Sequence, residues 1–275
     1  MISPLTEGIP KLGVPYKPFV FAVSALALLT GAWARASDDC RIASDQGGMR
    51  IPVERLDAES RCLISPIVGE HTTVGNVGPV QTPIPPDLFG FFLDKPIVLA
   101  ALVDRLKLGN YRFVEKGQRR YWVDDGDGTQ GLLTLVYRDE WARIYHLDGY
   151  HEGTVMPKMK PKAVVFLRLQ PAQAQDGRPA VQSNLVAYTQ LNDSFLSALV
   201  RLLSPLVGES VTRKLTRAID VTVELGTLIA QDPERVAREA AGLSGVDADD
   251  QKALNVYLHA VPVPAATSTT SRQSP

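Results

Sequence analysis

The sequence predicts an α+β domain in which an antiparallel sheet is followed by one long amphipathic C-terminal helix, with two short helices after the first strand. Residues 111–191 alternate apolar and polar side chains with a period of two, and turn residues interrupt the alternation at short intervals. Residues 192–232 change to apolar spacings of three and four, which is the helical period. Pro85 and Pro96 begin two apolar stretches ahead of the strands, where proline suits the first turn of a helix.

The first elements expected are one strand and two short helices. Residues 71–84 read as an extended segment that contributes an edge strand. Residues 85–94 and 95–109 each begin with proline near the first turn, and the second helix is expected to end at Gly109. Residues 37–71 before them are rich in Gly, Pro, Thr and Ser and are expected to form mostly an arm and loops.

Six segments with a period of two then predict successive antiparallel strands. They are residues 111–115, 119–124, 131–138, 141–152, 162–170 and 180–191.

The acidic stretch "DDGDGTQG" between the second and third of these segments raises the question of a calcium loop. An EF-hand loop needs glycine at position 6 and glutamate at position 12. Counted from Asp125, those positions hold Gln130 and Val136, and the flanking segments are aromatic and β-branched. The stretch is therefore interpreted as a hairpin turn.

The segment after the strands predicts helices. Asn192 or Asp193 can cap a first helix, and Pro205 can start a second, long amphipathic one. The apolar residues of the long helix recur at three and four: Val207, Val211, Leu215, Ala218, Ile219, Thr222, Leu225 and Ile229. Two smaller helices are expected in residues 233–260, and residues 261–275 read as a disordered tail.

This order of elements resembles the START-like helix-grip superfamily of lipid-transfer domains and aromatic polyketide cyclases over about residues 72–232. The resemblance lies in "TPIPPDLFGFFLDKPIVLAALV", "YWVDDGDGTQGLLTLVYR" and "LNDSFLSALVRLLSPLVGESVTRKLTRAIDVTVELG". It implies a strongly curved sheet wrapped around the long helix, an apolar cavity between them, and a hydrophobic small molecule, such as a lipid, isoprenoid or aromatic metabolite, as ligand.

Apolar side chains on the sheet and the helix are the candidate ligand-binding residues. Alternation places Ala163, Val165, Leu167 and Leu169 on one face of their strand, and Leu133, Leu135 and Tyr137 on one face of another. The candidate set is Leu133, Leu135, Tyr137, Val165, Leu167, Val211, Leu215 and Ile219. Such residues either fill a solid core or line a pocket, and the sequence leaves both readings open.

The first 36 residues have the layout of a secretory signal peptide. Lys11 and Lys17 precede an apolar run over residues 19–29, and small residues follow, so cleavage is expected near Ala36. The protein is expected to be periplasmic or secreted, with an uncleaved membrane anchor as the alternative. Cleavage would lower Lys+Arg from 29 to 26 and Asp+Glu from 30 to 29, a net charge of −3. That balance, without a basic stripe, argues against a nucleic-acid partner, while transient contact with a membrane or an envelope protein stays open.

Cys40 and Cys62 are the only cysteines of the chain, and both follow the signal segment. Disulfides persist in the exported compartment, so a bridge between the two is expected.

Catalytic motifs are absent from the sequence: it has no Gly-x-Ser-x-Gly, phosphate loop or dinucleotide fingerprint. In the polar stretch "HLDGYHEG", strand alternation puts His146 and Asp148 on one face and His151 on the other, so a shared metal site would need a bend at Gly149. The sequence thus predicts no cofactor and no metal site.

Three functions remain. The first is a non-enzymatic carrier or sensor of a hydrophobic molecule. The second is a cyclase- or hydratase-type enzyme that uses the same pocket, with His146 or Tyr145 as acid or base. The third is an interaction module with a solid core. The absence of a convergent polar cluster favours the first.

Overall fold

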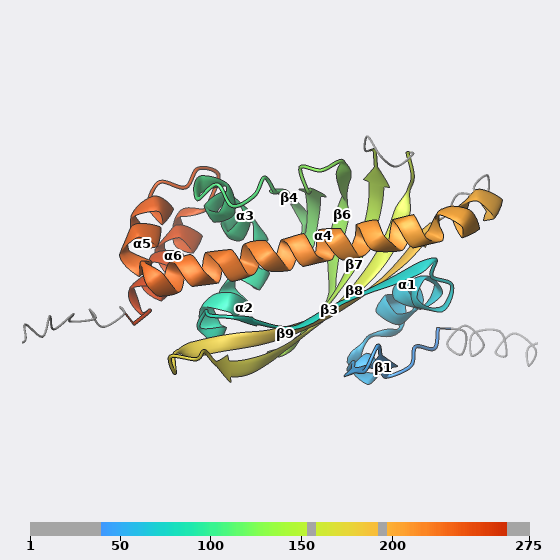
Figure 1. Cartoon of the computed structure of the whole chain (residues 1–275), viewed down its shortest axis with the longest axis horizontal. Coiled ribbons are helices and arrows are strands. Elements are labelled where there is room, and N and C mark those ends of the chain that lie inside the picture. Colours follow the sequence, from blue (N-terminus) through green and yellow to red (C-terminus); the bar gives the residue numbers. More distant parts are fainter. Residues whose placement is uncertain (1–39, 153–157, 192–196, 263–275) are drawn as a thin grey trace, which may run out of the picture. The chain divides into compact units, whose positions relative to one another are not determined.

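The computed structural model of the protein describes residues 40–152, 158–191 and 197–262. Within these residues one antiparallel sheet has the strand order β3-β9-β8-β7-β6-β5-β4 (Figure 1). The strands are β3 Thr73–Thr82, β4 Arg112–Gly117, β5 Arg120–Asp124, β6 Thr129–Arg138, β7 Ala142–His151, β8 Pro161–Gln173 and β9 Pro179–Leu191. The expected edge strand is β3, and the acidic stretch is the turn between β5 and β6, so both predictions are confirmed.

The two short helices and the long helix are present in the expected order. They are α2 Pro86–Asp94, α3 Pro96–Arg105 and α4 Ser197–Gln231. The expected end of the second short helix at Gly109 was too late, because Lys107 takes a φ of 60° and cannot continue the helix. The α+β class and the helix-grip arrangement, with the long helix held against a curved antiparallel sheet, are confirmed.

The prediction that Pro205 starts a second helix is wrong, because α4 runs through it without a break. Proline removes one backbone hydrogen bond, but its φ is helical, so a helix stabilised by packing can contain it. The proposed caps Asn192 and Asp193 lie outside the described residues.

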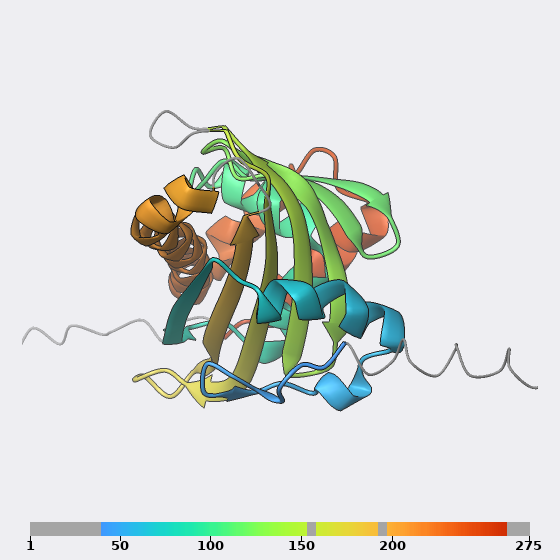
Figure 2. The same cartoon turned by 90° about the vertical axis from the view of Figure 1, so that its right-hand side faces the viewer.

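The helix α4 lies against one face of the sheet, here called the inner face, which carries Leu167 and Leu169 (Figure 2). Two glycines allow the close approach between α4 and β3. A Cβ on Gly226 would lie 2.7 Å from Thr82 Cγ2, and one on Gly75 would lie 3.2 Å from Leu215 Cδ1. Any larger residue at Gly226 would push the helix away from the strand.

The opposite, outer face carries Val164 and Phe166 and is covered by the N-terminal segment. This segment holds the small strands β1 Asp45–Gln46 and β2 Met49–Arg50 and the helix α1 Ala58–Gly69. Buried residues of α1 and the arm pack on the outer face in one cluster: Ile51, Leu56, Ile64, Ile67, Ile144, Val164, Phe166, Val186 and Tyr188. In Figure 2, α1 and α4 lie on different sides of the curved strands.

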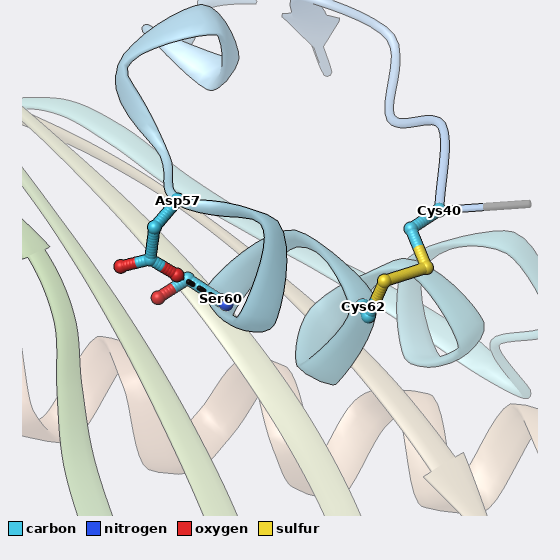
Figure 3. The surroundings of a disulfide bond; sticks show 4 residues. All are labelled: Cys40, Asp57, Ser60 and Cys62. Carbon is cyan, nitrogen blue, oxygen red and sulfur yellow. Dashed lines mark hydrogen bonds between the residues drawn. A yellow bond between two sulfur atoms is a disulfide. The ribbon is translucent and has the colours of Figure 1, made fainter. Parts of the chain in front are cut away.

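The helix α1 was not expected, since residues 37–71 read as arm and loops. Asp57 caps it by accepting a hydrogen bond from the Ser60 backbone N–H at 2.6 Å (Figure 3). Glycine and proline nearby hid the signal, although Ile64 and Ile67 have helical spacing. The expected disulfide between Cys40 and Cys62 is confirmed, and it ties the start of the arm to α1.

The chain continues after α4 with α5 Pro233–Ala240 and α6 Ala248–His259, in the region where two short helices were expected. Val236, Ala240, Leu254 and Leu258 of these helices are buried against the C-terminal part of α4 and against α2 and α3. The signal segment over residues 1–36 lies outside the described residues, as does most of the tail. None of the helices in the described residues is long and apolar enough to cross a membrane.

Candidate functional site

A cavity of about 260 Å³ lies between the inner face of the sheet and the N-terminal half of α4. One water needs only roughly 10–15 Å³ by the same kind of measure, so the space exceeds that of a few waters. Its sheet wall is formed by Phe113, Val123, Thr129, Leu147, His151, Pro161, Ala163, Val165, Ala187, Thr189 and Leu191. Its helix wall is formed by Val207, Ser210, Val211, Lys214, Leu215, Arg217 and Ala218. Tyr111, Asp124, Asp125, Asp127 and Met159 complete the lining.

The sheet wall is mainly apolar because strand alternation and register align inner-face residues across three neighbouring strands. Leu147 on β7 pairs with Ala163 on β8, which pairs with Thr189 on β9. Directly opposed residues in antiparallel strands share a face, so one apolar row is built from strands far apart in sequence. The next row contains Val165 and Ala187, which are also paired.

Small residues keep this part of the inner face open. Ala163, Ala187 and Ala218 line the cavity. Gly131 pairs with Gly149 in the next row, but these glycines do not line the cavity, and a Cβ on Gly131 would lie 2.6 Å from the Asp148 carbonyl oxygen. The short alanine side chains leave space that the neighbours do not close, because a folded backbone relaxes only partly into a void.

Beyond the cavity, the same layer between the sheet and α4 is filled. Leu225 and Ile229 of α4 are buried with Leu167 and Leu169 of β8. Aromatic side chains from α2, Phe89 and Phe92, enter the same cluster. The helix and sheet therefore enclose a hollow half, next to Val207–Ala218, and a filled half, next to Val221–Ile229.

A charged cluster stands at the rim of the cavity, where the β5–β6 turn meets α4. Lys214 Nζ lies 2.7 Å from Asp125 Oδ2 and 3.0 Å from Asp127 Oδ2, and it also donates to the Asp127 carbonyl at 3.0 Å. Burial alone would raise the pKa of Asp125. Hydrogen bonds from Lys214 and from the backbone N–H groups of Thr129 and Asp127 outweigh burial, so the pKa is lowered from its ordinary value. The acidic turn is thus a clasp on the long helix.

A histidine lies inside the cavity wall beside this clasp. His151 is 6% exposed, and its Nδ1 lies 3.0 Å from Thr129 Oγ1. Burial, and then the nearby charge of Lys214, lower the pKa of His151 from its ordinary value. Both effects favour the neutral form of the imidazole.

Three of the candidate residues chosen from the sequence line the cavity: Val165, Val211 and Leu215. Leu167 lies in the filled half. Leu133 pairs with Leu147 but does not itself line the space, and Leu135 and Ile219 are also not among the lining residues.

Tyr137 does not share a face with Leu133 and Leu135. The register shifts between Leu135 and Tyr137, and Tyr137 then pairs with Ile144 of the outer-face cluster. One extra residue in a strand turns every later side chain to the other face. The phenol donates to Asp139 Oδ2 at 2.9 Å.

The residues considered for acid-base or metal chemistry are separated. His146 pairs with Val164 on the outer face, whereas His151 lines the cavity, as alternation predicted. Tyr145 is on the inner face but is not among the lining residues, and burial raises the pKa of its phenol. In the described parts of the chain, no three His, Cys, Asp or Glu side chains are grouped closely enough to hold a metal ion.

The sequence reasoning did not select the polar residues of the lining. Lys214, Thr189 and Ser210 were not among the candidate residues. Asp125 and His151 were examined, but only as a calcium ligand and a metal ligand. A signal existed for Lys214, because it falls one turn after Ser210 and Val211 and one turn before Arg217 and Ala218 on the helical period.

Comparisons with known proteins add little to this geometry. No protein-family model matches the sequence, and no curated protein matches it. A conserved protein from Geobacillus kaustophilus aligns at 9% identity over 56% of this chain and 95% of that chain, with a TM-score of 0.37. Ara h 8.0201 aligns at 16% identity over 56% of this chain and 98% of that chain, with a TM-score of 0.36. The fold assignment therefore rests on the chain's own strands and helices.

Proposed function

We propose that this protein is an exported, non-enzymatic binding or transport protein for a hydrophobic small molecule, which it holds between the sheet and α4. The observation that carries the proposal is the cavity of about 260 Å³ whose walls are mainly aliphatic. Covering roughly 300 Å² of apolar ligand surface would contribute about 7 kcal/mol at ~25 cal/mol per Å², before ordering costs. That is enough for useful affinity without a buried charge.

The resemblance of the sequence to the START-like superfamily supports the same function, because a cavity under the long helix is what that resemblance implies. A lipid, an isoprenoid and an aromatic metabolite are all compatible with an aliphatic wall. Export is supported by the signal-like segment and by the disulfide between Cys40 and Cys62, since disulfides persist outside the cytosol. N-terminal sequencing of the protein from the cell envelope tests cleavage near Ala36.

The direct test of binding is mass spectrometry of an organic extract of the purified protein, paired with two tryptophan variants of α4. Leu215 lines the cavity, whereas Leu225 is 1% exposed in the filled half. Leu215→Trp should abolish ligand co-purification at little cost in thermal midpoint. Leu225→Trp should keep the ligand and lower the stability by about 1–3 kcal/mol, because it overpacks a solid core.

Two results would contradict the proposal. The first is that no small molecule is ever extracted from the parent protein and none of a panel of apolar probes binds to it. The second is that Leu215→Trp destabilises the protein as much as Leu225→Trp, which would mean that the cavity is closed in solution. Either result would favour an interaction module with a solid core.

A further inference from the structure

His151 presents a polar atom on the cavity wall that has no partner among the described residues. His151 is 6% exposed and lines the cavity, and its Nδ1 is occupied by Thr129 Oγ1 at 3.0 Å. No hydrogen bond to a described residue is formed by its Nε2. Among the described residues, the buried side-chain atoms without a hydrogen-bond partner are Thr73 Oγ1, Arg143 Nε and Ser183 Oγ. Nε2 has no partner among the described residues and is not one of these buried atoms, so we place it at the space that His151 lines.

The chemistry of that nitrogen depends on the tautomer. If the Thr129 hydroxyl donates to Nδ1, then Nε2 carries the proton and donates. If Nδ1 donates to Thr129, then Nε2 accepts. A hydroxyl group satisfies either case, because it can donate and accept. A methyl or methylene group at the same place would leave a buried nitrogen without a partner.

The charges of the rim do not select a charged ligand. The ammonium of Lys214 is held by both Asp125 and Asp127. The carboxylate of Asp124 accepts from Gln130 Nε2 at 3.0 Å and from the Gly126 backbone N–H at 2.8 Å. Arg217 is exposed at the rim, so an anion beside it would stay in water, where an ion pair gains little.

We infer that the cavity binds an uncharged, mainly apolar molecule that carries a hydroxyl group, and that His151 Nε2 recognises this hydroxyl. The inference rests on the proposed function and narrows its ligand class. His151 is then a residue that determines specificity, and Thr129 is a positioning residue that holds its ring. The lowered pKa of His151 agrees with this role, because a neutral ring keeps one nitrogen able to accept.

The test uses three naphthalene probes of similar size: 2-naphthol, 2-methylnaphthalene and 2-naphthoate. Dissociation constants are measured by fluorescence titration at pH 7 with the full-length protein as purified and delipidated. The parent should bind 2-naphthol about threefold to tenfold more tightly than 2-methylnaphthalene, which is the net effect of one hydrogen bond. It should bind 2-naphthoate most weakly.

The variant His151→Leu should abolish or reverse the preference for 2-naphthol. The matched control is His146→Leu, which changes a buried histidine on the same strand that faces the outer cluster, so its probe preference should equal that of the parent. Thr129→Val should reduce the preference without abolishing binding. If His151→Leu fails to fold, the order of the three probes on the parent still tests the preference for a hydroxyl group, and Thr129→Val tests the role of the histidine ring.

Two outcomes separate this inference from the proposed function. If 2-naphthol and 2-methylnaphthalene bind the parent equally, or if 2-naphthoate binds most tightly, the inference is overturned while the carrier function stands. If none of the three probes binds and no ligand is extracted, the carrier function itself fails and the inference fails with it.

Discussion

The two halves of the space between the sheet and α4 are built from the same elements but differ in side-chain volume. In the filled half, Leu225 and Ile229 meet Leu167, Leu169 and Phe92 and close the space. In the hollow half, the alanines Ala163 and Ala187 occupy inner-face positions. The comparison teaches that a helix-grip fold can be stabilised at one end and left open at the other, because one rigid helix spans both.

The hollow half lacks a core of its own, so its wall depends on the layer behind it. The inner residues Ala163 and Val165 alternate along β8 with Val164 and Phe166, which pack against α1 on the outer face. The disulfide between Cys40 and Cys62 ties the arm to that helix. The outer layer thus supplies the hydrophobic burial that the cavity gives up.

The largest expected effect is therefore the loss of this disulfide. The double variant Cys40→Ser/Cys62→Ser should lose about 3 kcal/mol of unfolding free energy, from closure of a loop of about 22 residues in the chain-entropy model. Urea denaturation measures the loss, and hydrogen exchange should increase first in β8 and β9 rather than around Leu225. An equal increase in hydrogen exchange in both halves would contradict the conclusion that only the hollow half depends on the outer layer.

The second largest effect is expected from enlarging a buried alanine, and it should differ between the two halves. Ala240 of α5 is 0% exposed in the core cluster that continues from the filled half, and Ala187 is 2% exposed but lines the cavity. Ala240→Leu should destabilise by about 1–3 kcal/mol through overpacking. Ala187→Leu can place its extra carbons in open space, so it should keep the thermal midpoint while weakening probe binding. A midpoint that falls equally in both variants would mean that the alanines of the cavity are already in full contact.

Acid between pH 7 and pH 5 should act on the hollow half before the filled half, because the buried His151 lines the cavity and the filled cluster contains no histidine. The folded-state pKa values of His151 and His146 are lowered from 6.5, by burial in the first place. Stability from a lowered pKa is fully present above pH 6.5 and is lost as the pH falls through the folded-state value. The thermal midpoint should fall between pH 7 and pH 5, and His151→Leu should make this fall shallower. If the pH dependence of the thermal midpoint is unchanged in that variant, His151 does not cause the fall.

The smallest expected effect on stability is at the clasp. Lys214→Met should change the unfolding free energy by less than about 1 kcal/mol, because the ion pair is partly exposed. The same variant should release bound probe faster, since the β5–β6 turn no longer holds α4 at the rim. The control is Arg213→Met, which changes the exposed neighbouring residue. Stopped-flow release at low and high salt measures the difference, and identical release rates in the two variants would contradict the clasp.

Local sequence patterns determined the elements of this protein. Period-two alternation identified the strands from residue 111 onward, the proline positions identified α2 and α3, and the spacing of Val211, Leu215 and Leu225 identified α4. These signals suffice because hydrogen bonding within an element and the burial of one face are encoded by neighbours along the chain. The sequence also predicted the disulfide, since Cys40 and Cys62 had no other partner.

Only the tertiary structure decided which apolar residues line a cavity and which fill a core. Val165 and Leu167 share a strand, a face and an aliphatic character, yet one lines the cavity and the other is buried in the filled half. Their difference comes from what lies opposite: short side chains in one case, and Leu225 with the aromatic residues of α2 in the other. A bulge after Leu135 turned Tyr137 to the outer face, and the β5–β6 turn met Lys214 across 89 positions of the chain. Such volumes and contacts depend on register and on partners distant in sequence, and no periodicity in a single segment records them.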